Sequence, residues 1–261
     1  MTTQLQIAAA TLAASLLAAA PATAADASAS VQITSLQFSA GSGLTVQWLP
    51  DSLYQSLFAE SREAGGLGGN DLADPAPGAA WADQQLATGT AHAAASAQAG
   101  ASGLLAAAGS ASRSLFSPDA GQPHRALSWA QQSGWFQLSG AGSLSITVGY
   151  QIAAAAPLGD GLPTFAGATL QLQAGNLDAG SSGLAEDQLW SFDLPAGSAS
   201  RSGTLSLVVD ISDPLQTGYY DLRANADVSA VSSVPEPGGW ALLALGLATL
   251  GALVRRQQRA N

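Results

Sequence analysis

The chain has 261 residues with no cysteine and no lysine, and its eight arginines are outnumbered by 18 acidic residues, which gives a net charge of −10. Because such a chain repels phosphate backbones and anionic lipid surfaces, the charge argues against nucleic acid as a partner. The missing cysteine excludes disulfides and thiolate zinc sites, although a chain of this length can bury a sufficient core without them.

Residues 1–25 are predicted to be a secretory signal peptide. An uncharged run at 7–20 is rich in alanine and leucine, and a proline follows it. Ala22 and Ala24 then form the small-residue pattern at which signal peptides are cut, so we expect cleavage after Ala24 or Ala25. Because the first six residues carry no Lys or Arg, an uncleaved signal anchor is the alternative.

Residues 26–233 are expected to form one exported domain with a net charge of about −12. Its first apolar residues, such as Val31 and Ile33, alternate with polar ones, and the apolar positions then shift to even numbers from Leu36 onward. The shift predicts a β-bulge. The return of the alternation after a glycine-rich turn predicts a hairpin over 31–49.

A low-complexity insertion is predicted at about residues 51–120. Glycine and proline are concentrated at 65–71 and 75–78, which indicates loops, and 84–112 is nearly all Ala, Ser, Gly and Gln. Alanine favours helix, but the glycines and the missing apolar stripe leave little surface to bury. We therefore expect this insertion to be partly helical or mobile and to lie against a sheet.

Five later segments alternate apolar and polar residues, as expected of antiparallel strands with one solvated face. They lie at 144–152, 168–174, 190–194, 205–211 and 220–228. Together with the strands of the first hairpin they make seven or more strands, with no alternating helices. The predicted fold is therefore mainly β, an antiparallel two-sheet sandwich that is jelly-roll-like in outline.

The end of the chain carries a glutamate between two prolines, an uncharged run and an arginine cluster. As a helix, the run at 238–254 spans roughly 25 Å, which is just enough to cross a bilayer. The arginines are expected to stay in the cytoplasm, which places the preceding domain on the far side of the membrane. The residues concerned are Val234, Pro235, Glu236, Pro237, the interfacial Trp240, Arg255, Arg256 and Arg259.

In the order and spacing of these residues the chain resembles the PEP-CTERM family of exported bacterial proteins. The resemblance covers residues 234–261 alone. It implies sorting by an exosortase, a membrane-embedded cysteine protease-transpeptidase that cuts near Pro235, Glu236 and Pro237. The precursor is then expected in the inner membrane of a Gram-negative bacterium, and the processed domain at the cell surface or in the exopolysaccharide matrix of a biofilm. A plain single-pass anchor that is never processed is the alternative.

Motifs that carry catalysis are missing from the sequence, which has no G-x-S-x-G, H-E-x-x-H, C-x-x-C or P-loop pattern. A Ser-His-Asp site through His92 or His124 is conceivable. A polysaccharide hydrolase needs only two carboxylates, but solvated strand faces and loops explain the available ones more simply. These carboxylates include Asp193, Asp210, Asp221 and Asp227. No catalytic residue is therefore expected.

Calcium binding requires several hard oxygen ligands that converge on one point. The stretch 65–72 echoes a glycine-rich calcium repeat, but it occurs in a single copy and its acid lies one residue late. Further oxygen ligands are available from Glu186, Asp187, Asp210 and Asp213. Solvated loops explain these acids more simply, so no metal and no cofactor is expected.

Four aromatic residues are candidate platforms for sugar rings, with core packing as the alternative: Trp129, Trp135, Tyr219 and Tyr220. Taken together, the sequence predicts a non-enzymatic, exported β-sandwich protein of the cell surface or the extracellular polysaccharide matrix. The alternatives are a carbohydrate-binding module and a polysaccharide hydrolase that uses a pair of carboxylates.

Overall fold

The computed structural model of the chain describes residues 27–63, 68–73, 78, 80–113, 123–157, 164–195 and 197–231. The predicted signal peptide at 1–25 and the predicted sorting signal at 234–261 lie outside these residues. No helix within the described part is long and apolar enough to span a bilayer. The membrane-spanning helix predicted at 238–254 therefore stays a prediction.

The described residues form two antiparallel sheets, which we call sheet A and sheet B. In spatial order, sheet A contains β12 (Ser198–Ile211), β9 (Gly142–Ala155), β1 (Ala27–Ala40), β7 (Leu105–Ala111), β6 (Ala93–Ala99) and β5 (Gln84–Gly89). Sheet B contains β11 (Ser181–Trp190), β10 (Phe165–Asn176), β13 (Gly218–Val231), β8 (Pro123–Leu138), β3 (Tyr54–Arg62) and β4 (Gly68–Ala73), and β2 (Val46–Trp48) pairs with the end of β8. The mainly β, two-sheet prediction is confirmed.

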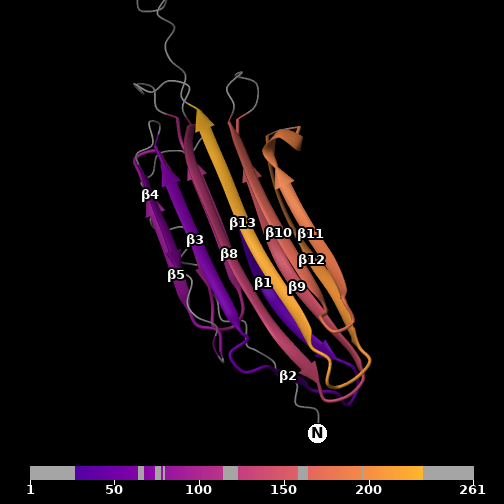
Figure 1. Ribbon diagram of the computed structural model, residues 1–261. Helices are drawn as coiled ribbons and strands as arrows, with labels where there is room; N and C mark the ends of the chain where they lie inside the picture. The colour runs from indigo at the N-terminus through magenta and orange to yellow at the C-terminus, as the bar shows by residue number, and fades with distance from the viewer. Residues whose placement is uncertain are drawn as a thin grey trace, which may run out of the picture.

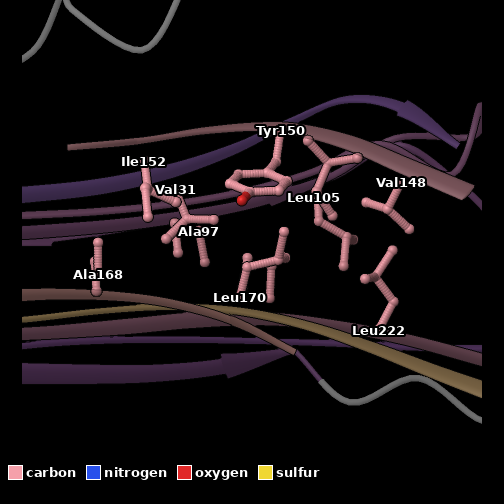
Figure 2. Packing of buried hydrophobic residues seen from close by; sticks show 14 of the residues in the cluster. Val31, Ala97, Leu105, Val148, Tyr150, Ile152, Ala168, Leu170 and Leu222 are labelled. Carbon is pink, nitrogen blue, oxygen red and sulfur yellow. The ribbon is translucent and has the colours of Figure 1, made fainter. Parts of the chain in front are cut away.

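The two sheets face each other along their whole length (Figure 1). Strands β4 and β5 lie at one edge of the molecule, and β11 and β12 lie at the other. Because neighbouring residues on a strand point to opposite faces, every second side chain enters the space between the sheets. Figure 2 shows these inner side chains meeting, with Val148 and Ile152 from sheet A above Leu170 and Leu222 from sheet B.

The predicted β-bulge is present, because the pairing of β1 with β9 shifts register between Ile33 and Ser35. The predicted hairpin over 31–49 is wrong. Strand β1 pairs with β9 and β7 in sheet A, whereas β2 pairs with β8 in sheet B. Phe38 and Trp48 meet across the sandwich, with their ring centroids 5.0 Å apart. Each strand thus buries its apolar residues by facing the other rather than by pairing beside it.

The partly helical or mobile insertion predicted at 51–120 is also wrong. Strands β3 to β7 arise from this segment, and β6 and β7 lie inside sheet A rather than on it. Alanine fills the inner positions of β6, and Ala97 is fully buried. Opposite Gly109 of β7 the sheets approach so closely that an added Cβ would lie 3.2 Å from the Val228 side chain. Small residues therefore line this part of the core, and tertiary packing overrides the helix propensity of alanine.

The strand predicted at 190–194 is wrong beyond its first residue. Strand β11 lies before it, at Ser181–Trp190, and Ser191–Asp193 form a 3₁₀ turn, η1. Phe192, predicted to face the core, is 65% exposed. The chain leaves the sheet here because the turn carries it toward sheet A, where β12 begins at Ser198.

We predict that enlarging an inner alanine of β6 destabilises the fold. Ala97→Leu adds three carbon atoms where both sheets are in contact, so it should lower the free energy of unfolding by about 1–3 kcal/mol. Ala94→Leu on the outer face of the same strand is the matched control and should change stability little. Thermal denaturation followed by circular dichroism measures both. Equal losses in melting temperature would show that β6 does not form part of the core.

Candidate functional site

The outer faces of the two sheets differ in chemistry. In the described residues, the outer face of sheet A presents mainly Ser, Thr, Ala, Gly and Gln, with no aromatic side chain. Strand alternation and register place seven aromatic residues on the outer face of sheet B. These residues are Tyr54, Phe58, Trp129, Trp135, Phe165, Trp190 and Tyr219. A flat face that collects aromatic side chains is the strongest candidate for a binding surface.

Trp135 is the most open aromatic residue of this face, with 52% of its surface exposed. It pairs across the β8–β13 ladder with Tyr219, which in turn pairs with Gly175 of β10. Gln173 Nε2 donates a hydrogen bond to the Tyr219 hydroxyl over 3.2 Å. We call the paired Trp135 and Tyr219, with Gly175 beside them and the Gln173 amide at their edge, the aromatic platform.

Trp129 has a different environment. Its ring is stacked with that of Phe58, with centroids 5.9 Å apart and planes 16° from parallel. The Arg223 guanidinium carbon lies 5.0 Å from the Trp129 ring centroid, a cation–π contact. Phe58 and Arg223 come from β3 and β13, the strands on either side of β8. Trp129 is therefore held in a stack of planar groups rather than lying open as Trp135 does.

The carboxylates of this face are engaged by neighbouring side chains. Arg125 donates from both Nε and Nη2 to Asp227, over 3.2 and 3.1 Å, and this hydrogen bonding raises the pKa of Arg125. Gln131 Nε2 donates to Asp221 over 2.6 Å. Burial raises the pKa of Asp221, although the Gln131 hydrogen bond and the Arg223 charge oppose that rise. These carboxylates therefore hold neighbouring side chains of the surface in place through hydrogen bonds.

The two histidines lie together at the end of the sandwich where β3 ends and β8 begins. Their ring centroids are 4.8 Å apart, and Glu63 joins them: its carboxylate accepts the His92 backbone N–H over 2.8 Å and lies 2.7 Å from His124 Nδ1. His124 belongs to β8 and is buried, because its position on that strand faces the core. Burial lowers the pKa of His124 despite the charge of Glu63.

This histidine cluster does not have the arrangement of a Ser-His-Asp triad. A triad needs one histidine that bonds both the serine and the acid. Here Ser112 Oγ lies 3.4 Å from His92 Nδ1, whereas the Glu63 side chain pairs with the other ring, that of His124. The cluster instead ties strands of sheet B to the β5–β6 turn of sheet A. Sequence reasoning missed it because 32 positions separate the two histidines.

Glu186 and Asp187, two of the acids that could supply oxygen ligands for calcium, do not converge on one point. Glu186 and Asp187 are neighbours on β11 and so point to opposite faces, Glu186 toward Gln171 on the outer face and Asp187 into the sandwich. Asp187 accepts hydrogen bonds from the Tyr150 hydroxyl and the Arg201 guanidinium, both of sheet A. Burial, and then the bond to Asp187, raises the pKa of Tyr150 to about 12. In the described part, no three His, Asp or Glu side chains are placed to hold a metal ion.

Of the four predicted sugar platforms, the structure brings Trp129, Trp135 and Tyr219 to one face and puts Tyr220 in the core. Tyr220 is fully buried, and its hydroxyl accepts a hydrogen bond from Gln132 Nε2 over 2.7 Å. The predicted sorting and cleavage residues lie outside the described residues: Ala22, Ala24, Ala25, Val234, Pro235, Glu236, Pro237, Trp240, Arg255, Arg256 and Arg259.

We predict that acid destabilises the fold through His124. Because folding lowers its pKa, the unfolded chain takes up the proton first, and stability falls as the pH drops below about 6.5. Burial acts to raise the pKa of Glu63, but hydrogen bonds from Thr90 and His92 and the charges of the two histidines lower this pKa overall. Glu63 therefore adds to the loss only as the pH falls from about 4.5, its ordinary pKa, through the lowered value. His124→Asn keeps an N–H near Nδ1 but cannot titrate, so its melting temperature should stay level between about pH 6.5 and 5.

The matched control is His92→Asn, which keeps His124 and should keep the fall in melting temperature. If His124→Asn and the natural chain lose stability in parallel over this interval, His124 is not the group responsible.

Comparison with protein-family models, curated proteins and solved structures finds no match to this chain. The evidence for a function therefore comes from the geometry of the outer face of sheet B and from the sequence of the tail.

Proposed function

We propose that this chain is a non-enzymatic, exported β-sandwich protein that binds extracellular polysaccharide through the outer face of sheet B. The observation that carries the proposal is the segregation of every outward-facing aromatic residue of the described strands to this one face. The C–H-rich faces of sugar rings pack against aromatic rings, and amide and carboxylate groups beside the rings hydrogen-bond the sugar hydroxyls. Trp135, Tyr219 and Gln173 provide this combination.

The strand order supports a jelly-roll arrangement for this domain. Strands β8, β13, β10 and β11 of sheet B lie opposite β7, β1, β9 and β12 of sheet A, and the connections from β7 to β8, β8 to β9, β9 to β10, β11 to β12 and β12 to β13 each change sheet. Lectin domains are among the proteins that use jelly rolls, so the fold is compatible with glycan binding. Because one fold can serve many functions, the proposal depends on the aromatic face rather than on the fold.

A hydrolase is less well supported by the same surface. Glycoside hydrolysis needs two facing carboxyl groups, one of them available as an acid. Asp227 is held by Arg125, Glu60 by Arg62, and Asp221 by Gln131. These contacts give each carboxylate a structural role, so we propose binding without catalysis.

We further propose that the tail delivers this domain to the cell surface or the exopolysaccharide matrix through an exosortase. Strand β13 starts beside Tyr219 and ends at Val231, three residues before the Pro-Glu-Pro signal begins at Val234. The aromatic platform therefore lies at the end of the sandwich away from the tail. In the proposed inner-membrane precursor, Trp135 is then expected at the end of the domain that is farther from the bilayer.

We predict that Trp135→Ala weakens polysaccharide binding at least about fivefold, since truncating an aromatic anchor of a binding surface costs more than about 1 kcal/mol. The full chain, purified in detergent and applied to a glycan array, measures this effect. Val208→Ala removes an exposed apolar side chain from the outer face of sheet A and is the matched control. If Trp135→Ala and the natural chain bind every glycan equally well, the aromatic platform is not the binding site.

We predict that replacing Pro235, Glu236 and Pro237 with alanine prevents processing without preventing export. The replacement removes the extended segment that the enzyme would bind before the apolar run begins, while the run and the arginines remain. In a host with an exosortase, the variant should stay in the inner membrane at precursor length, and the natural chain should lose residues 238–261. Mass spectrometry of the surface-released natural protein checks this: peptides from Trp240 to Arg255 would identify the run as a permanent anchor.

A further inference from the structure

Strands β13 and β10 form a polar lane along the middle of the outer face of sheet B. The outward side chains of the two strands pair as Gln173 with Asp221, Gln171 with Arg223 and Thr169 with Asn225. Glycines continue the β10 row at its two ends, where Gly175 pairs with Tyr219 and Gly167 with Asp227. We call these ten positions the polar lane. From Gly175 to Gly167 it extends roughly 27 Å at the usual rise of a strand.

Large side chains border the polar lane on both sides. Trp129 and Trp135 stand on β8, beside β13, whereas Leu184 and Trp190 stand on β11, beside β10. The polar lane thus runs parallel to the strands between two rows that carry large apolar side chains. A ligand that follows it is elongated and lies along the strands rather than across them.

An aromatic station lies near each end of the polar lane. At one end is the platform of Trp135 and Tyr219 described above. At the other, the Trp190 ring covers Gly167, and Phe192 is stacked on Trp190 with ring centroids 5.6 Å apart and planes 21° from parallel. Phe192 is strongly exposed, so this stack also offers an open ring. Two stations so far apart suit a chain of several sugar units rather than a single sugar.

Charges in the polar lane nearly cancel. Asp227 is paired with Arg125, and Asp221 lies two residues from Arg223 on the same face of β13. The remaining groups are uncharged: three amides, the hydroxyls of Thr169 and Tyr219, and two glycines. Amides and hydroxyls both donate and accept hydrogen bonds. The chain as a whole is strongly acidic, so an anionic polymer gains no long-range attraction. The chemistry of the polar lane thus fits a polymer of uncharged hydroxyl groups.

We infer that an uncharged linear polysaccharide binds lengthwise along the polar lane, with sugar rings stacked at the Trp135–Tyr219 station and at the Trp190–Phe192 station. This inference rests on the proposed function and gives it a direction, a minimum ligand length and a charge class. The hydroxyl groups between the two stations exchange hydrogen bonds with Gln171, Gln173 and Asn225.

The test uses the full chain in detergent and affinity electrophoresis through gels that contain hydroxyethylcellulose, glucomannan, alginate or hyaluronan. We expect retardation by an uncharged polymer and none by the two anionic ones. Titration calorimetry then compares the hexasaccharide and the disaccharide of the retained polymer. The hexasaccharide should bind at least about tenfold more tightly, because only it can reach beyond one station.

A blocking variant distinguishes binding along the polar lane from binding at its two aromatic ends. Asn225→Trp places a bulky ring at mid-lane and leaves both stations intact, so hexasaccharide affinity should fall to that of the disaccharide while disaccharide affinity is unchanged. Gln151→Trp, on the exposed outer face of sheet A, is the matched control and should bind as the natural chain does. Equal melting temperatures establish that both variants fold.

Each contrary outcome has a distinct meaning. If the disaccharide binds as tightly as the hexasaccharide, or if Asn225→Trp binds the hexasaccharide normally, the inferred binding along the polar lane is wrong. The proposed glycan binding itself then stands. If alginate or hyaluronan retards the chain more than the uncharged polymers do, only the inferred charge class of the ligand is wrong. If none of the four polymers retards the chain, the proposed function itself fails.

Discussion

The spacing of the two sheets is the constraint on which the rest of this structure depends. Near β6 and β7 the inner positions are alanine and glycine, so the backbones approach closely. Near β2 and the end of β8 they are aromatic, and Phe38, Trp48 and Tyr220 pack edge to face. An inner side chain of a given size fits only where the residues of the opposite sheet leave the right space for it, because protein interiors are close-packed.

Two groups of polar side chains inside or beside this interface are paired across it. Tyr150 and Arg201 of sheet A bond Asp187 of sheet B near one edge, and Glu63 joins the two histidines near one end. A buried polar group without a partner costs more than its hydrogen bond contributes when it is made. These contacts therefore fix how the sheets are aligned, and the same pairing explains why neither cluster has the geometry of a catalytic or metal site.

Because one side of every described strand packs in the core, the outer faces are the surfaces that these strands offer to a ligand. The outer face of sheet A is small and uncharged over most of its area, whereas that of sheet B combines aromatic rings, amides and balanced charges. That difference is not needed for folding, since either face would be solvated equally well by serine and threonine. A surface that departs from what folding requires is where a ligand is expected.

Period-2 alternation in the sequence by itself determined the mainly β fold, most strands of the second half and the bulge after Ile33, because a strand with one buried face must alternate. It failed at β6, where alanine lies on both faces of the strand, so the sequence shows no difference in hydrophobicity between the inner and the outer face. It also failed at Phe38 and Trp48, because alternation says which face is buried but not which strand lies alongside. Only the tertiary structure decided those pairings, the meeting of His92 with His124 and the collection of aromatic rings on sheet B. Each depends on register between strands far apart in the chain, which local sequence does not encode.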